Sequence, residues 1–278
     1  MSTDERREAL LGVIRGARTR LSLSLFRCND EAVFSELAAA TARGVAVEVL
    51  VTSRASGGRK KIARLWRDLE GTGAALHAYA DSVVKYHAKY LIADDGPAVV
   101  ASLNFTRKCF QKTCDALVIT YDPGVVFGLR QIMAADCEGR AVPADLADRL
   151  IVGPERARRQ FTALIGQARS SIRVIDAKLS DPDIEARLNA RRDEGLIVEI
   201  INAKRLGDLK SHGKIMLIDE SRVVVGSLAL DTLSLDFHRE VAISVTDPAA
   251  VAVAVELFRA VQRGQADADG HSPATAAR

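Results

Sequence analysis

The residues of this chain that are best suited to chemistry come in two copies of one eight-residue frame. Each copy reads His-x-Lys-x4-Asp, and together they use two of the five histidines in the chain. The six residues are His87, Lys89, Asp94, His212, Lys214 and Asp219. One such frame can arise by chance, but two in one chain indicate a duplicated catalytic unit.

The spacing of the two copies is kept well beyond the frames. Ser102 and Ser227 each follow their histidine by fifteen residues, and Asp115 and Glu240 follow theirs by twenty-eight. A lone histidine on a strand is more often structural than catalytic. The register shared over twenty-eight residues reverses that expectation.

The residue types suit a phosphodiester substrate. Residues two apart in a strand point to the same face, so each histidine would share a face with the lysine of its frame. The two lysines could hold the anionic phosphoryl oxygens. One neutral imidazole could then attack phosphorus while the other, protonated, donates to the leaving alkoxide. Histidines with an ordinary pKa of about 6.5 can share these opposite roles near neutral pH.

Four acidic residues could assist the histidines. Asp115 and Glu240 are the candidates for orienting the imidazole rings, since an acid on the far side of a ring fixes its tautomer and stabilises its cation. Asp94 and Asp219 fall at the ends of predicted strands, where aspartate commonly stabilises turns. A structural role and a chemical role are both open for these two.

The elements that must position these residues also occur twice. Ala17-Arg18 aligns with Ala168-Arg169 at an offset of 151 residues, which falls to 125 at the frames, so the first copy carries 26 more residues (151 − 125). In each copy a helix, a strand, a helix and a second strand precede a third strand that starts at the frame. The predicted helices are 4–18, 30–43, 154–169 and 181–193, and the predicted strands include 20–25, 115–121, 171–176 and 240–246.

Strands that alternate with helices predict an α/β fold, with mixed sheets flanked by helices. A closing helix is expected to begin at Asp122-Pro123 and again at Asp247-Pro248, because proline is common in the first helical turn. We therefore expect two halves, at residues 1–145 and 146–263. Residues 264–278 have no periodic apolar pattern and are predicted to be a disordered tail.

These motifs resemble those of the phospholipase D superfamily, the HKD family, whose signature is His-x-Lys-x4-Asp, then Gly-Ser-x-Asn and an acidic residue. The similarity runs from about residue 8 to residue 260. Two motif positions distinguish the copies: Ala101 replaces the usual glycine in the first, whereas the second keeps Gly226 but has Ala229 where the family has asparagine. The matching first-copy asparagine is Asn104.

The resemblance implies an active site at the seam between two pseudo-twofold-related halves, with no metal and no cofactor. It also implies a two-step reaction through a covalent phosphohistidine, with His87 as nucleophile and His212 as acid. Ser102, Asn104, Asp115, Ser227 and Glu240 would bind the phosphate or support the site. Loss of the positioned amide at Ala229 would cost about 2.7 to 4 kcal/mol of transition-state stabilisation, unless the substrate supplies its own contacts.

Composition sets outer limits on the function. The net charge is +3, and 48% of the residues are hydrophobic. The longest nearly uninterrupted apolar run, 249–258, is shorter than the roughly 20 residues that cross a bilayer. The N-terminus lacks the apolar core of a secretion signal, so we expect a cytoplasmic protein. Peripheral contact with a membrane is compatible with this expectation. No two of the four cysteines form a Cys-x2-Cys pair, and buried free thiols are expected.

Two segments could recognise the substrate. Residues 54–67 hold six basic residues and no acid, and could hold nucleic-acid phosphates or an anionic membrane, or be a solvated helix face. Residues 228–237 are largely apolar and could meet acyl chains or pack in the core. Aromatic content of 5% argues against stacking platforms for single-stranded nucleic acid. The favoured interpretation is phospholipid hydrolysis or phosphatidyl transfer by a monomer. A metal-independent endonuclease and a phosphodiester-binding module without turnover are the alternatives.

Overall fold

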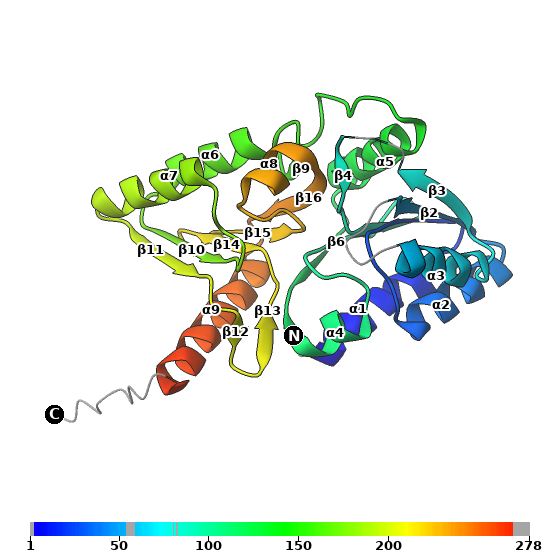
Figure 1. The fold of residues 1–278 in the computed structure, drawn as a ribbon, viewed down its shortest axis with the longest axis horizontal. Helices are drawn as coiled ribbons and strands as arrows, with labels where there is room; N and C mark the ends of the chain where they lie inside the picture. The colour runs from blue at the N-terminus through cyan, green and yellow to red at the C-terminus, as the bar shows by residue number, and fades with distance from the viewer. Residues whose placement is uncertain (1–2, 54–58, 80, 82, 269–278) are drawn as a thin grey trace.

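The computed structural model describes residues 3–53, 59–79, 81 and 83–268, and its two larger sheets lie side by side (Figure 1). The first has six strands in the order β3-β2-β1-β5-β6-β8. The second has seven, in the order β11-β10-β14-β15-β16-β4, with β9 paired to β16. Their bounds are β1 Arg20–Leu25, β2 Ala46–Thr52, β3 Ala75–Tyr79, β4 Lys85–Tyr86, β5 Tyr90–Ala93, β6 Ala98–Ala101, β8 Leu117–Thr120, β9 Leu150–Gly153, β10 Ser171–Ile175, β11 Ile197–Ile201, β14 Ile215–Ile218, β15 Arg222–Gly226 and β16 His238–Val245.

Helices flank both sheets, which confirms the predicted mixed α/β fold. Asp30 and Asp181 cap the second helix of each copy by accepting hydrogen bonds from backbone N–H groups. The closing helix starts at Pro123 after a capping Asp122, as predicted. The helices are α1 Thr3–Gly16, α2 Glu31–Ala42, α3 Arg59–Glu70, α4 Arg107–Lys112, α5 Pro123–Glu138, α6 Ala157–Gln167, α7 Pro182–Asp193, α8 Thr232–Phe237 and α9 Pro248–Ala268.

Short strands link the two sheets by an exchange. β4 leaves the first copy and pairs in parallel with the start of β16, so that Lys85 lies opposite His238. In the same way β13 (Leu209–Ser211) pairs in parallel with β7 (Thr113–Cys114), with Lys210 opposite Thr113. Both members of the second pair stand 125 residues from members of the first. The third sheet, β12-β13-β7, is completed by β12 (Arg205–Leu206).

The inner core joins the two sheets. Tyr90 and Val100 of the first sheet belong to the same buried cluster as Val225 and Val241 of the second. Each sheet also has a buried cluster of its own, which lies between that sheet and the helices that flank it. The short strands β4 and β13 directly precede the two frames, so the frames are held where the sheets meet. The division of the chain at residues 145 and 146 stays a prediction.

Three sequence-based expectations need correction or comment. Residues 87–89 do not start a strand, because the chain crosses there from β4 in one sheet to β5 in the other. Helix α9 continues to Ala268, so residues 264–268 are helical rather than disordered, and 269–278 lie outside the described residues. In the basic segment, 54–58 also lie outside them. The rest is α3, which buries Leu65 and Leu69 and exposes its bases to solvent.

Two expectations about composition can also be compared with the fold. Cys28, Cys109 and Cys114 are buried free thiols, as predicted, and Cys137 is partly buried. Across the described ranges, no helix combines the length and the apolar character needed to cross a bilayer.

Candidate active site

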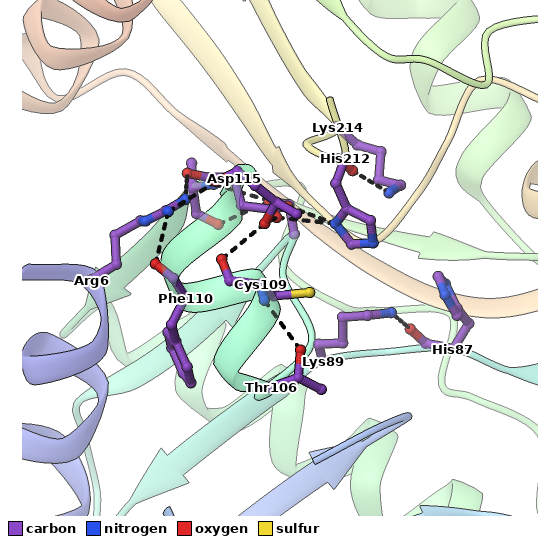
Figure 2. A network of polar contacts seen from close by, with 12 residues as sticks. Arg6, His87, Lys89, Thr106, Cys109, Phe110, Asp115, His212 and Lys214 are labelled. Carbon is purple, nitrogen blue, oxygen red and sulfur yellow. Dashed lines mark hydrogen bonds and ion pairs between the residues drawn. The ribbon is translucent and has the colours of Figure 1, made fainter. Parts of the chain in front are cut away.

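The two histidine–lysine pairs lie in equivalent links between strands. His87 and Lys89 follow β4 and precede β5, and His212 and Lys214 follow β13 and precede β14. Each link directly follows the short strand that pairs with the other copy. The backbone N–H of His87 is held by the carbonyl of Arg239, at 2.9 Å, across the junction. The crossing brings the pairs together, and Figure 2 shows them in one site.

Each histidine is oriented by an acid from the other copy. His87 Nδ1 lies 2.9 Å from Glu240 Oε2. His212 Nδ1 lies 3.0 Å from both carboxylate oxygens of Asp115 (Figure 2). An ionised acid accepts a hydrogen bond from the N–H at Nδ1, which leaves Nε2 of each ring to do chemistry. Residue spacing identified these acids as candidates, but the crossed pairing follows from the strand exchange.

Hydroxyl groups hold both acids in place. Asp115 accepts from Ser102 Oγ at 2.7 Å and from Thr113 Oγ1 at 2.5 Å. Glu240 accepts from Ser234 Oγ at 2.8 Å. Ser227, the counterpart of Ser102, instead bonds the backbone of Val241, donating to its carbonyl at 3.2 Å and accepting from its N–H at 3.1 Å. Ser102 therefore holds an acid, whereas Ser227 holds the backbone of β16.

Burial sets the protonation of the histidines. Desolvation, with the Lys89 and Lys214 charges adding to it, lowers the pKa of His87 to about 3 and outweighs the Glu240 carboxylate. Burial also lowers the pKa of His212. Burial on its own would raise the pKa of Glu240, but its interactions with His87 and His238 and the charge of Lys89 hold that pKa well below its usual value. At neutral pH the free site thus holds ionised acids and neutral imidazoles.

The two lysines form a buried cationic pair. Lys89 is 1% exposed and Lys214 is 7% exposed. Each ammonium donates to the carbonyl oxygen of the histidine in its own frame, at 2.5 Å. Burial, followed by the charge of Lys214, lowers the pKa of Lys89 to about 7. A bound anion would relieve this penalty, so the pair is suited to hold phosphoryl oxygens.

The third residue of each frame lies at the opposite end of the following strand. Asp94 accepts from the backbone N–H groups of Arg18, Thr19 and Arg20 at 2.8 to 3.0 Å. Asp219 does the same for residues 169–171. Both adopt left-handed backbone geometry, with φ of 44° and 53°. These contacts fasten a turn to the start of the first strand of each copy and favour the structural role for Asp94 and Asp219, while the chemical role stays a prediction.

The asparagine position differs between copies, as the sequence indicates. Asn104 is 8% exposed, and its Oδ1 is buried without a hydrogen-bond partner in the described part of the chain. Ala229 is buried, and its backbone N–H donates to Ser234 Oγ at 3.0 Å. In this copy Ser234 thus links the Ala229 backbone to Glu240. At this position the first copy has a side-chain amide, and the second has a methyl group.

The motif glycine has a steric reason in one copy. A Cβ on Gly226 would lie 2.3 Å from Ala242 Cα, which no side chain tolerates. Its counterpart, Ala101, is a buried alanine on β6. The close approach of β15 and β16 therefore explains why the second copy keeps the glycine.

Three contributors were missed by sequence reasoning. His238 Nδ1 lies 3.4 Å from Glu240 Oε1, and the position of His238, two residues before the acid, is a signal that could have found it. Phe26 packs edge-on against His87 with ring centroids 4.4 Å apart. Arg6 of α1 is buried and donates to the Asp115 carbonyl at 2.6 Å (Figure 2). Nothing in the sequence marks Arg6, because its partners lie more than 100 residues away.

One group of side chains could in principle hold a cation. Cys109, Asp115 and His212 offer ligand atoms within 4.8 Å of one another. A cation there would displace the hydrogen bond that orients His212. The arrangement thus fits an acid–histidine pair better than a metal centre.

The chain is similar to known proteins in sequence and in fold. A family model described as "Cardiolipin synthase, PLD-like domain" matches residues 10–137. No sequence among curated proteins matches the chain. Among solved structures, polyphosphate kinase from Porphyromonas gingivalis is similar with a TM-score of 0.74 and 18% identity, over 92% of this chain and 44% of that chain. This chain thus spans less than half of that protein.

Two further structures are similar. Phosphatidylserine synthase from Haemophilus influenzae Rd KW20 has a TM-score of 0.73 and 11% identity, over 95% of this chain and 84% of that chain. A phospholipase D family member, Nuc from Salmonella typhimurium, has a TM-score of 0.42 and 24% identity, over 47% of this chain and 85% of that one. The two similarities above 0.7 extend over nearly the whole chain and show a shared fold.

Proposed function

We propose that the chain is a phosphodiesterase of the phospholipase D superfamily, working in two steps through a covalent phosphohistidine. The crossed acid–histidine pairs support this most directly, since two independently oriented imidazoles meet beside two buried lysines. One chain supplies every one of these groups.

In the first step, the lone pair of His87 Nε2 attacks phosphorus and the bond to the leaving oxygen breaks. The leaving alkoxide takes a proton from Nε2 of a protonated His212. Lys89 and Lys214 hold the non-bridging oxygens. The pKa of His212 is lowered in the empty site, and the negative charge of a bound phosphodiester would raise it, so the acid is made ready by the substrate.

In the second step, His212 takes a proton from water or an alcohol, whose oxygen attacks phosphorus. The bond between phosphorus and His87 Nε2 breaks and the free enzyme returns. Hydrolysis and transfer therefore differ only in the acceptor. We propose a phospholipid as the substrate, because the short helix α8 beside Glu240 carries exposed apolar side chains.

The test is turnover in EDTA by wild type, His87→Ala and a matched control. His77→Ala is the control, since His77 is 40% exposed on β3 and pairs only loosely with Glu48 at 3.8 Å. Phosphatidylcholine and phosphatidylglycerol vesicles are offered in parallel with single- and double-stranded DNA. Vesicle cleavage that is lost only in His87→Ala is expected. DNA cleavage that is lost in the same variant would show that the substrate is a nucleic acid and not a phospholipid. Binding of either substrate without turnover would refute the proposed enzymatic activity.

A further inference from the structure

Two short helices occupy equivalent places beside the site but present opposite chemistry. α4 and α8 are each six residues long and capped by Thr106 and Asp231, which stand 125 residues apart. α8 leads directly into β16, which carries Glu240, and α4 leads into β7, which Asp115 directly follows. Figure 1 shows them on opposite sides of the region where the two sheets meet. What their exposed faces carry therefore decides what can approach the site.

The α4 side is cationic. Lys108 and Lys112 are four residues apart and share a helix face. They line an open groove of about 740 Å³ between α4 and the β12–β13 hairpin. The lining of this groove, here called the cationic rim, is Lys108, Lys112, Lys204, Arg205, Asp208 and Lys210. Five bases against one acid give the cationic rim four net positive charges, and Lys210 of this rim stands two residues before His212.

The α8 side is apolar at three of these positions. Leu233 and Phe237, the counterparts of Lys108 and Lys112 at the offset of 125, are 61% and 48% exposed. Val83, the counterpart of Asp208, is 74% exposed. The register of β4 against β16 brings the segment of Val83 alongside the end of α8. Val83, Leu233 and Phe237 form the apolar rim.

For residues 228–237, the two alternatives from the sequence each apply to part of the segment. Leu228, Leu230 and Leu235 are buried and pack in the core, whereas Leu233 and Phe237 face solvent. Scattered exposed apolar residues are ordinary on any protein surface. Here three of them replace charged residues at duplicated positions beside the site, so chance exposure does not account for the pattern.

We infer that the two rims seat the site on the surface of an anionic phospholipid bilayer. The cationic rim would contact head-group phosphates, as basic patches do at anionic membranes. The apolar rim would enter the interface among the upper parts of the acyl chains. A nucleic-acid backbone would match cations on both sides, and it offers nothing to aliphatic side chains such as Val83 and Leu233. Membrane docking does not depend on the proposed phosphodiester chemistry. Only the cleavage of a docked phospholipid rests on that proposal.

Docking is tested by flotation of the full chain with vesicles of phosphatidylcholine alone or mixed with phosphatidylglycerol. The variants are Leu233→Ser with Phe237→Ser, and Lys108→Glu with Lys112→Glu. Each has a matched control of the same chemistry elsewhere: Phe127→Ser, since Phe127 is 61% exposed on α5, and Lys60→Glu with Lys61→Glu on the exposed face of α3. Melting temperatures close to that of wild type confirm that the variants fold.

We expect at least tenfold weaker binding to mixed vesicles for each rim variant and little change for the controls. Binding of wild type should fall with salt, and less steeply after the lysines are replaced. Equal binding by rim and control variants would overturn the inference. So would binding of DNA, but not vesicles, that is lost with Lys108 and Lys112.

Cleavage of soluble bis(p-nitrophenyl) phosphate separates this inference from the proposed function. The rim variants should cleave it as wild type does, since their substitutions lie outside the site, whereas His87→Ala should not. Vesicle binding by a wild type that cleaves nothing would refute the chemistry and leave the docking surface standing. Cleavage without vesicle binding would do the reverse.

Discussion

Replacement of Glu240 by glutamine probes the crossed pairing most sharply. Glu240 is 1% exposed and contacts His87, Ser234 and His238. Glutamine has the same shape but no charge, and its amide group must face one of these partners. If the amide faces His87, two donors meet, and the imidazole is driven to carry its proton on Nε2. That tautomer cannot attack phosphorus.

The expected loss follows from these contacts. A hydrogen bond to a charged group contributes about 1.5 to 3 kcal/mol, which is about 10- to 160-fold in rate. Reversal of the tautomer can raise the loss to about 10⁴-fold. We therefore expect kcat to fall by about 10²- to 10⁴-fold. Stability should change little, because the substitution also removes a buried charge.

The assay is steady-state cleavage of bis(p-nitrophenyl) phosphate, with melting temperature as the check on folding. Glu199→Gln is the matched control, since Glu199 on the edge strand β11 pairs with Arg173 on the neighbouring strand β10. The control should keep wild-type kcat. A folded Glu240→Gln enzyme with kcat within threefold of wild type would refute the role given to Glu240.

Three further predictions concern the lysine pair and the scaffold. Lys89 must be protonated to hold the anion, and the pKa of Lys89 is about 7 in the free site. We therefore expect kcat/KM to fall tenfold per pH unit above about pH 7, and Lys89→Arg to flatten this alkaline part of the profile. A wild-type profile that stays level to pH 9 would contradict the role given to Lys89. Asp94→Asn should lower stability by about 1 to 2 kcal/mol with unchanged kcat per folded molecule. The Asp94 contribution should be present above pH 4 and be lost as the pH falls, because backbone N–H groups hold its pKa below the ordinary value despite its partial burial; a loss of kcat with normal stability would contradict the structural role. Gly226→Ala should cost about 1 to 3 kcal/mol by overpacking against Ala242, while Ala101→Gly should cost less; equal melting temperatures would exclude the clash.

Much of this architecture could be predicted because it is written in local patterns. Helix α2 and strand β1 were placed to within a residue, since capping aspartates and apolar runs mark their ends. The duplicated spacing also identified Asp115 and Glu240 as the orienting acids. These features depend on residues near one another in sequence.

The remainder depends on contacts between distant segments. Which acid serves which histidine is decided by the pairing of β4 with β16 and of β13 with β7. The same crossing breaks the strand that was expected at His87. The roles of Arg6 and Phe26, and the position of α4 and α8 beside the site, become visible only in the folded chain.

The most direct test of the central claim is to trap the covalent intermediate. Wild type, His87→Ala and His212→Ala are mixed with bis(p-nitrophenyl) phosphate, quenched in alkali, digested and analysed by mass spectrometry. The mechanism predicts a phosphoryl adduct on His87 in wild type, more of it in His212→Ala if attack is slowed less than release, and none in His87→Ala. An adduct on His212 in the His87→Ala enzyme, or turnover by wild type with no adduct on either histidine, would contradict it.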